Sequence, residues 1–343
     1  MKSRALQVAA HPRGEVGPEH FEVVPVELPD PDQLAAGSVL VRNTWTSVDP
    51  GMRLRLRPAA PDGYFTAFDL HAPMDGVLTI GEVVASRADG FEPGDVVWHS
   101  LGWREHAVVR AGESAMNGVG TLRVLDPGDA PHQHFLGPLG PMGLTAYAGL
   151  AVVDGLSGGR VLWVSAAAGA VGSLVVQIAR NLGHRVVASA GSDEKVAWLR
   201  DDLGVAAFNH RSEPLGEALA RLAPEGIDLY FDNVGGEHLE AALDAMTMHG
   251  RIALCGSISD YESEPTGPRN IFLATAKHLT LSGFRGSLHL DLLEEMQQRM
   301  AGWIRDGRLV APETVYDGLE QAPRAMADML AGRTTGKTLV RLG

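Results

Sequence analysis

VLWVSAAAGAVGS, residues Val161–Ser173, passes from an apolar run through small residues into a second apolar segment. The first run has the length of a buried strand, and the second has helical periodicity. Small residues between them let the main chain turn tightly and pack closely. The stretch predicts a strand, a tight turn and a helix.

The turn has the composition of a phosphate-binding loop. Gly169 and Ala170 let the main chain approach a pyrophosphate, whose charge the N–H groups and dipole of the following helix stabilise. Gly172 permits close packing of the helix on the sheet. Alanines replace the earlier glycines of the usual G-x-G-x-x-G pattern, so a tight turn without a ligand is the alternative.

Around this stretch, apolar runs alternate with helical segments across residues 139–305. The alternation predicts βαβ units in a doubly wound, six-stranded parallel sheet, the Rossmann fold. The expected strands are Val161–Ala166, Arg185–Ala190, Ala206–Asn209, Ile227–Val234, Arg251–Gly256 and Leu279–Phe284. The expected helices are Val171–Leu182, Glu194–Leu203, Leu215–Leu222, His238–Met246, Ile271–Ala276 and Leu292–Ile304.

Proline content separates this region from the preceding one. Fourteen of the 20 prolines lie at or before Pro141, and none lies between it and Pro214. Short alternating stretches broken by turns indicate a mostly β domain over residues 1–138, which a turn-rich β tail, 306–343, rejoins. Its expected strands are Ser38–Arg42, Gly76–Ser86, Asp95–His99 and Gly102–Val109.

Composition excludes several classes of protein. Asp and Glu number 42 against 29 Lys and Arg, a net charge of −13, which argues against nucleic acid. The single cysteine, Cys255, allows no intramolecular disulfide and no cysteine cluster for zinc. Charges and prolines interrupt the first twenty residues, and no apolar run could span a membrane, so a cytoplasmic protein is expected.

The end of the second expected strand bears on the choice of cofactor. An NAD enzyme commonly places an acid there against the ribose 2′-hydroxyl, but Ala190-Gly191-Ser192 offers none. Asp193 and Glu194 follow, where they suit the cap and first turn of a helix.

Positive groups gather at the same place. Lys195 could reach a 2′-phosphate, and His210 and Arg211, at the end of the third expected strand, add positive charge on that side. These residues favour NADPH over NADH. The alternative for Lys195 is a solvated helix lysine.

Further segments have a specific pattern and extend over most of the chain. They are DPGMR (49–53), GPLGPMGLTAY (137–147), AAAGAVGS (166–173), AGSDEK (190–195), YFDNVGG (230–236), CGSISDY (255–261), GF (283–284) and GK (336–337). Together they resemble the zinc-independent medium-chain dehydrogenase/reductase superfamily. The similar group contains leukotriene B4 12-hydroxydehydrogenase/prostaglandin reductases, alkenal double-bond reductases and curcumin reductases.

This resemblance implies an NADPH-dependent reductase of the C=C bond of α,β-unsaturated ketones and aldehydes. It also implies a GroES-like first domain and a homodimer formed through the nucleotide-binding sheets. The cofactor residues that it implies are Gly169, Ala170, Val171, Gly172, Lys195, His210, Asn233, Cys255, Gly256, Ile258, Ser259, Tyr261, Phe284, Thr334, Met142 and Thr145.

Three positions depart from the family pattern. Gly51 stands where the family usually has a tyrosine that borders the substrate pocket, so a wider cleft for bulkier enones is expected. His210 replaces a tyrosine near the 2′-phosphate, and Thr334 replaces an asparagine. The candidate substrate residues are Gly51, Arg53, Tyr64, Trp45, Trp98 and Trp103, with packing in the β domain as the alternative for the last five.

Tyr261, just past the fifth expected strand, is the candidate catalytic residue. Reduction of an enone needs a hydride at the β-carbon, stabilisation of the enolate oxygen and a proton at the α-carbon, here from water. A tyrosine hydroxyl is protonated at neutral pH and can donate a hydrogen bond to that oxygen, together with the nicotinamide ribose hydroxyl. The alternative is a loop tyrosine that packs its ring.

A catalytic metal is not expected. The zinc branch of the superfamily usually has Gly-His-Glu where this chain has LTIGEV, 78–83, without the histidine. His132 and His134 lack further ligands nearby in sequence. Two other functions stay open: a quinone oxidoreductase of the same superfamily, and a non-catalytic NADPH-binding protein with a structural or regulatory role.

Overall fold

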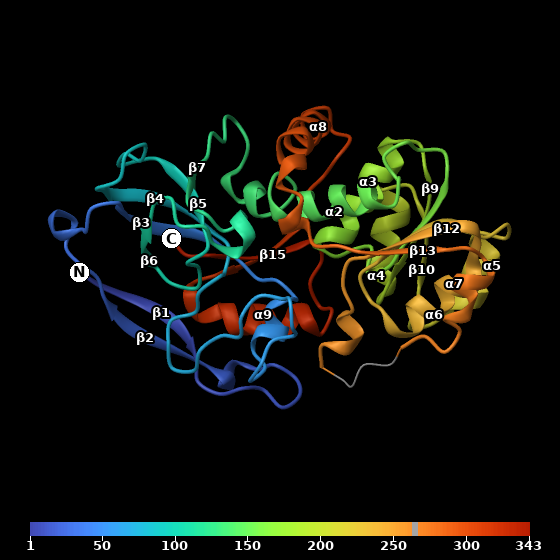
Figure 1. The fold of residues 1–343 in the computed structure, drawn as a ribbon, viewed down its shortest axis with the longest axis horizontal. Helices are drawn as coiled ribbons and strands as arrows, with labels where there is room; N and C mark the ends of the chain where they lie inside the picture. Colours follow the sequence, from blue (N-terminus) through green and yellow to red (C-terminus); the bar gives the residue numbers. More distant parts are fainter. Residues whose placement is uncertain (263–266) are drawn as a thin grey trace. The chain divides into compact units, whose positions relative to one another are not determined.

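The computed structural model describes residues 1–262 and 267–343, which divide into two compact units (Figure 1). Unit 1 comprises Met1–Gly137 and Glu313–Gly343, and unit 2 comprises Pro138–Pro312. Unit 1 is therefore built from two separate stretches of chain, whereas unit 2 is continuous.

Unit 2 is an α/β structure. Among the described residues its six strands form one parallel sheet in the order β10-β9-β8-β11-β12-β13, which confirms the expected Rossmann fold. Its elements are α2 (Pro141–Val152), β8 (Val161–Val164), α3 (Ala170–Asn181), β9 (Arg185–Ala190), α4 (Asp193–Ala197), β10 (Ala206–Asn209), α5 (Leu215–Leu222), β11 (Ile227–Asp232), α6 (Gly236–Ala245), β12 (Met246–Leu254), α7 (Phe272–Ala276), β13 (Thr280–Gly283) and α8 (Leu293–Arg305).

The strand order reverses direction between β8 and β11. The chain runs outward from β8 to β9 and β10, then returns to place β11 on the other side of β8. Open α/β sheets bind ligands beyond the carboxyl ends of the strands at such a point. The topology therefore predicts a ligand site at the residues that follow β8 and β11.

Both of these strands end earlier than the sequence suggests. β8 stops at Val164 rather than Ala166, because Ala166 adopts a left-handed conformation with φ 46°. β11 stops at Asp232 rather than Val234, because the Asp232 side chain accepts the N–H groups of Val234 and Gly235. In each case the end of the strand is fixed by the turn that follows it.

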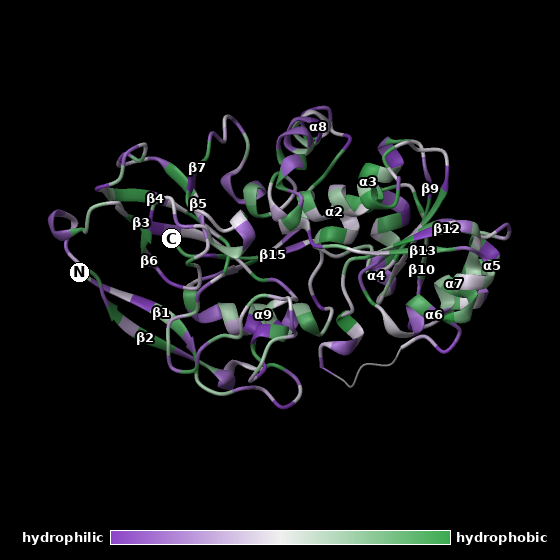
Figure 2. Ribbon diagram, viewed as in Figure 1, coloured by the Kyte–Doolittle hydropathy of each residue, from purple (hydrophilic) through white to green (hydrophobic). Residues whose placement is uncertain are grey.

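Helix α2 is apolar on all sides, and Figure 2 shows no strongly hydrophilic residue along it. Its residues Tyr147, Ala146 and Leu150 are fully buried. Within the sheet, Trp163 stacks on Tyr230 with 4.4 Å between ring centroids. Within the part of the chain described here, no helix combines the length and apolarity needed to cross a membrane.

Unit 1 is mostly β, as expected. Strands β1 and β2 pair antiparallel, and the larger sheet of the described residues has the order β14-β15-β3-β4-β5-β7, with β6 paired to β3. Its elements are β1 (Lys2–Val8), β2 (Phe21–Glu27), β3 (Ser38–Ser47), α1 (Met52–Arg55), β4 (Thr79–Ser86), β5 (Val96–His99), β6 (His106–Arg110), β7 (Arg123–Val124), β14 (Glu313–Asp317), α9 (Ala322–Leu330) and β15 (Lys337–Arg341).

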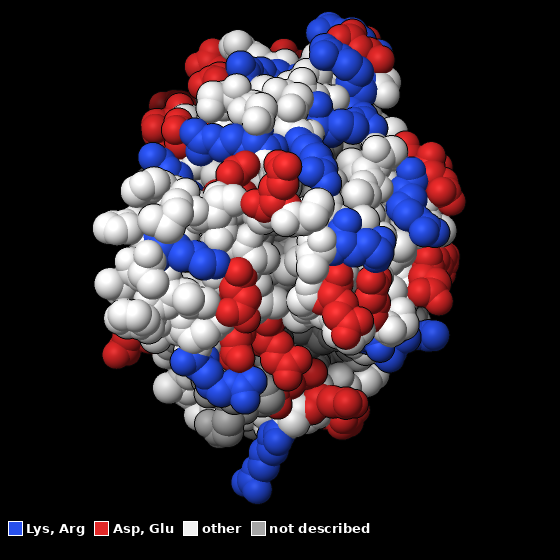
Figure 3. All heavy atoms as spheres, turned by 90° about the vertical axis from the view of Figure 1, so that its right-hand side faces the viewer, with Lys and Arg blue, Asp and Glu red and all other residues white. Residues whose placement is uncertain are grey.

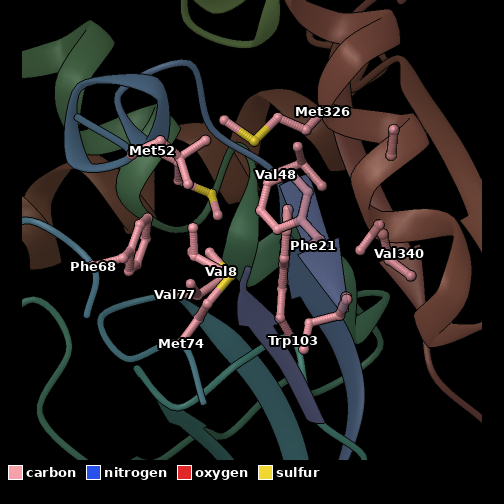
Figure 4. Close-up of a cluster of buried hydrophobic side chains, with 14 of the residues drawn as sticks. Val8, Phe21, Val48, Met52, Phe68, Met74, Val77, Trp103, Met326 and Val340 are labelled. Carbon is pink, nitrogen blue, oxygen red and sulfur yellow. The ribbon is translucent and has the colours of Figure 1, made fainter. Parts of the chain in front are cut away.

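A cluster of buried apolar side chains joins the two stretches of unit 1 (Figure 4). Phe21 and Trp103 lie in contact, with ring centroids 5.5 Å apart, and Met326 and Val340 come from the C-terminal stretch. Burial of large aromatic and aliphatic groups is the main favourable term for such a core. The C-terminal stretch is therefore part of the core of unit 1.

The C-terminal stretch differs from the expected turn-rich β tail in containing the nine-residue helix α9. Strand β15 follows it and pairs with β3, Val340 opposite Thr46. The Lys337 ammonium is buried and donates to the carbonyl oxygens of Val48 and Thr338 and to the carboxylate of Asp49. These bonds fix the turn that follows β3.

Arg55 organises the segment between α1 and β4. Its guanidinium is buried and donates to the carbonyl oxygens of Thr66, Asp75 and Gly76 at 2.7–2.8 Å. It also lies over the ring of Phe68, 3.9 Å from the centroid. Burial lowers the pKa of Arg55 to about 10, so the group stays charged at neutral pH.

Arg55→Lys is expected to destabilise the protein by about 2–4 kcal/mol, because one buried ammonium cannot reproduce the three divergent hydrogen bonds of the guanidinium. Urea unfolding followed by tryptophan fluorescence measures the change. Arg13→Lys, at an exposed position, is the matched control and should differ from wild type by less than about 0.5 kcal/mol. Equal stabilities of the two variants would contradict the assigned role.

Candidate functional site

The carboxylate of Asp232 lies at the carboxyl end of β11 and is 1% exposed. Its Oδ1 accepts hydrogen bonds from the Tyr230 hydroxyl at 2.8 Å and from the N–H groups of Val234 and Gly235 at 2.9 and 2.8 Å. Burial raises its pKa, and these donors oppose that shift. One buried acceptor thus holds the strand end and the turn together.

Asn233 and Ser165 connect the two strands at the reversal of the sheet. The Asn233 side-chain amide donates to the carbonyl oxygen of Ser165 at 2.7 Å, and the Asn233 N–H donates to the Ser165 hydroxyl at 3.0 Å. The structure therefore places Asn233 at the sheet edge where ligands bind in this fold.

The turn after β8 is tightly closed. Ala167 N–H donates to the Ser189 carbonyl, and Gly169 N–H donates to the Ala166 carbonyl at 3.0 Å. A Cβ at Gly172 would overlap that carbonyl oxygen, so a larger residue would push α3 away from the turn. Gly169 precedes α3, whose first residues are Ala170 and Val171. The N-terminal N–H groups of this twelve-residue helix lie beside the turn.

Positive groups meet at the ends of β9 and β10. A Cβ at Gly191 would lie 3.2 Å from the Arg211 Nε and 3.3 Å from the His210 Nε2. Lys195 is part-buried, and its pKa is lowered by burial and by the nearby charge of Arg211. Ser192 caps the short helix α4 and positions Lys195, whose N–H bonds the Ser192 hydroxyl. The structure brings Lys195, His210 and Arg211 together.

The segment after β12 folds back onto the turn after β11. Cys255 and Gly256 both donate their N–H groups to the Asp232 carbonyl oxygen, at 2.9 and 3.1 Å. Ile258 N–H donates to the Asn233 carbonyl, and the Ser259 hydroxyl donates to the Val234 carbonyl at 2.7 Å. The Cys255–Ser259 segment is thereby fixed at the sheet edge.

Tyr261 follows a 3₁₀ turn, Ile258–Asp260, in this segment. A Cβ at Gly256 would lie 3.3 Å from the Tyr261 hydroxyl oxygen and 3.6 Å from the Asn233 carbonyl oxygen. The hydroxyl thus lies beside the carboxyl ends of β11 and β12. Burial and the charge of Asp232 raise the pKa of the Cys255 thiol to about 12, which keeps it protonated and unreactive at neutral pH.

Other candidate cofactor residues in unit 2 make packing contacts. The Phe284 ring lies edge-on to Phe231, and a Cβ at Gly149 of α2 would overlap both rings. The Thr145 hydroxyl donates to the Pro141 carbonyl at 2.8 Å within α2. Met142 is part-buried on the same helix. These residues pack in the interior of unit 2 beside β11 and β12.

Gly51 and Tyr64 lie against each other in unit 1. A Cβ at Gly51 would overlap the Tyr64 hydroxyl, although the backbone of Gly51 is α-helical and suits any residue. The space beside position 51 therefore already contains an aromatic side chain from the segment between α1 and β4. Sequence reasoning placed both residues at the substrate side but did not foresee this contact.

The remaining candidates in unit 1 are mostly in packing positions. Trp98 and Trp103 are fully buried, and the Trp103 indole N–H donates to the Ser47 carbonyl. Arg53 is buried and donates to the Gly14 carbonyl, whereas Trp45 is part-buried beside Arg341. Thr334 is also buried in this unit, where its hydroxyl accepts from Thr338. Such burial leaves Trp98 and Trp103 no surface for a substrate.

His134 lies 4.0 Å from a carboxylate oxygen of Glu313, and burial lowers the pKa of the histidine. Over residues 1–262 and 267–343, no group of three or more His, Cys, Asp and Glu side chains is arranged to hold a metal ion.

Comparison with known proteins identifies the family. Residues 4–117 match the family described as the N-terminal domain of oxidoreductase, and residues 170–304 match the one described as zinc-binding dehydrogenase. The chain is 39% identical to a 2-alkenal reductase (NADP⁺-dependent) of Nicotiana tabacum, over 89% of this chain and 87% of the relative. The chain belongs to the zinc-independent medium-chain dehydrogenase/reductase superfamily.

Two further members of the superfamily match nearly the whole chain. Prostaglandin reductase 1 of Mus musculus is 36% identical, with 99% of each chain covered. The crystal structure of CurA from Vibrio vulnificus in complex with NADPH is 32% identical, with a TM-score of 0.89 and 99% of each chain covered. The expected family resemblance is confirmed.

Tyr230 and Asp232 lie in the YFDNVGG segment, but the sequence alone assigns no role to them or to His238. The available signal for Asp232 was a carboxylate at the end of an otherwise apolar strand, directly before Asn233 and two glycines. A charge in that position is expensive unless it is hydrogen-bonded, so it indicates a structural acceptor.

Asp232→Ala is expected to destabilise the protein by about 3 kcal/mol or more, because the Tyr230 hydroxyl and the N–H groups of Val234 and Gly235 lose their acceptor. Asp232→Asn keeps an acceptor oxygen and should cost less than half as much. Urea unfolding measures both, with Asp201→Ala at an exposed position as the control. If Asp232→Ala matches that control, Asp232 does not hold the sheet edge.

Proposed function

We propose that the protein is an NADPH-dependent reductase of the C=C bond of α,β-unsaturated ketones and aldehydes. The observation that carries the proposal is the position of the Tyr261 hydroxyl, beside Gly256 and Asn233 at the carboxyl ends of β11 and β12. It provides a hydrogen-bond donor at the edge of a dinucleotide-binding sheet. The names of the tobacco and mouse relatives support the same reaction class.

The residues of unit 2 fit NADPH. The tight turn at Gly169 and Gly172 leads directly into the N-terminus of α3, whose N–H groups suit a pyrophosphate. Lys195, His210 and Arg211 suit a 2′-phosphate, and no acid stands at 190–192 to prefer a free ribose hydroxyl. The NADPH in the related CurA structure supports this assignment.

The chain contributes orientation and electrostatics to the reaction. Bound NADPH supplies the hydride for the β-carbon of the substrate. The Tyr261 hydroxyl donates a hydrogen bond to the carbonyl oxygen of the substrate as negative charge develops there, which lowers the barrier. The Asp232 network keeps the segment that bears Tyr261 fixed against the turn after β11. Water protonates the α-carbon.

We also propose a homodimer formed through unit 2. Strand β13 lies at one end of the parallel sheet, and Ile271 and Phe272 at the start of α7 are 50% and 74% exposed. A second copy could pair with this edge and cover these side chains.

Acidic and basic side chains are interspersed on the face shown in Figure 3. This mixture of charges does not favour binding of a polyanion such as nucleic acid.

Oxidation of NADPH, followed at 340 nm against enals, linear and cyclic enones, aryl enones and quinones, tests the reaction class. The expected products are saturated carbonyl compounds. Consumption of quinones alone would assign the protein to the quinone oxidoreductases, and binding of NADPH without turnover of any substrate would make it a non-catalytic binding protein.

Tyr261→Phe is expected to lower kcat/KM for the best enone on the order of 10²-fold, because one oxyanion donor is lost. NADPH binding and thermal stability should change little. Tyr316→Phe is the matched control, since it removes a tyrosine hydroxyl that lies in unit 1, where it donates to Asp328. Unchanged turnover in Tyr261→Phe would remove Tyr261 from the mechanism.

Gly51→Tyr is expected to change substrate selectivity, because its side chain must displace the Tyr64 hydroxyl from the space that it fills. The ratio of kcat/KM for small alkenals to that for cyclic and aryl enones should shift several-fold towards the small substrates. Gly216→Ala, where an added Cβ meets nothing within 4 Å, is the control. An unaltered ratio would exclude position 51 from the substrate site.

A further inference from the structure

His210 is held edge-on against a second, deeply buried histidine. The rings of His210 and His238 lie 4.8 Å apart with 76° between their planes, and His238 stacks on Trp163 at 5.9 Å and 19°. His238 is 6% exposed, and within the described residues its Nε2 has no hydrogen-bond partner. The His210 ring therefore has a rigid aromatic wall on its α6 side.

Charged groups face His210 from its own loop and from α4. Arg211 follows it directly, and the His210 Nε2 and Arg211 Nε both lie over Gly191 at the end of β9. Lys195 comes from α4, where the exposed Glu194 partly opposes the lowering of the Lys195 pKa by burial and Arg211. Asp193 on the same helix accepts a hydrogen bond from the Asn209 side chain at 2.7 Å. The surroundings of His210 thus contain two cations.

These surroundings disfavour a positive charge on either ring before a ligand binds. Burial and the charge of Arg211 lower the pKa of His210, and burial and His210 lower the pKa of His238 to about 3. Both rings are therefore neutral at neutral pH. A dianionic 2′-phosphate beside Arg211 and Lys195 would reverse the local potential, which favours the imidazolium form of the nearer ring, His210.

We propose that His210 takes up a proton when a 2′-phosphate binds, so that the preference for NADPH over NADH increases as the pH falls towards neutral. The proton comes from solvent and goes to the His210 imidazole, while no covalent bond of the cofactor changes. The usual tyrosine at this position cannot accept a proton. The inference rests on the NADPH part of the proposed function and is independent of the substrate and of Tyr261.

The direction of proton exchange on binding distinguishes titration of His210 from titration of the 2′-phosphate. A phosphate monoester has a second pKa of about 6, which cations lower, so the phosphate tends to release protons on binding. On this proposal His210 has a lowered pKa before binding and a higher pKa afterwards. It therefore takes up protons on binding at pH values between these two pKa values. The affinity for NADPH then rises as the pH falls through that range.

Titration calorimetry of the full-length protein with NADPH and with NADH, in two buffers of different ionisation enthalpy, measures proton uptake directly. At pH 7, wild type should take up more protons than His210→Tyr when NADPH binds. When NADH binds, proton uptake should be the same in the two proteins. Between pH 8.5 and 6.5 the Kd for NADPH should fall several-fold more in wild type than in the variant, because only wild type has an imidazole at this position that takes up a proton on binding. His210→Gln, which keeps a hydrogen-bond donor but does not titrate, should behave as His210→Tyr.

His238→Phe identifies the ring that titrates. It preserves the stack on Trp163 and the contact with His210 but removes the second imidazole, and it should retain the proton uptake of wild type. Equal proton uptake by wild type, His210→Tyr and His210→Gln would overturn the proposal, as would loss of the uptake in His238→Phe alone. Because only binding is measured, absence of enone reduction would leave the result unaffected.

Discussion

The buried carboxylate of Asp232 is the constraint on which the candidate site depends. It ends β11, holds the turn that carries Asn233, and supports Tyr230 in the core of the sheet. The main-chain carbonyl of the same residue receives Cys255 and Gly256. A single residue therefore determines where two neighbouring strands stop, and the segment that presents Tyr261 takes its position from that edge.

Much of unit 2 could be predicted because its signals are local. β9, β10 and α5 have the bounds expected from apolar runs and helical periodicity. Helix α2 could not be predicted in this way, because it is apolar on all sides and its sequence shows no alternation of apolar and polar residues at helical spacing. In unit 1, helix α9 was missed in a tail that resembled short strands, although its apolar residues recur at helical spacing and pack against the core around Trp103.

The candidate site was less predictable than the fold, because its contacts join residues that are distant in sequence. Lys195 and His210 could be assigned to one side of the sheet from the βα alternation alone. The filling of the space beside Gly51 by Tyr64 could not, since it depends on the path of an irregular segment fixed by Arg55. The tryptophans were the least reliable indicators of the substrate site, because a large aromatic residue suits a core and a pocket equally well.

The split of unit 1 between two stretches of chain affects the order in which the protein can fold. Unit 2 is continuous, and its parallel strands follow one another along the chain, so it can form while synthesis proceeds. The sheet of unit 1 lacks β14 and β15 until residues 313–341 have left the ribosome, and Lys337 then enters the core beside Val48. Until that moment the edge of β3 that later pairs with β15 lacks its partner strand, and the apolar surface around Phe21 and Trp103 is exposed to solvent.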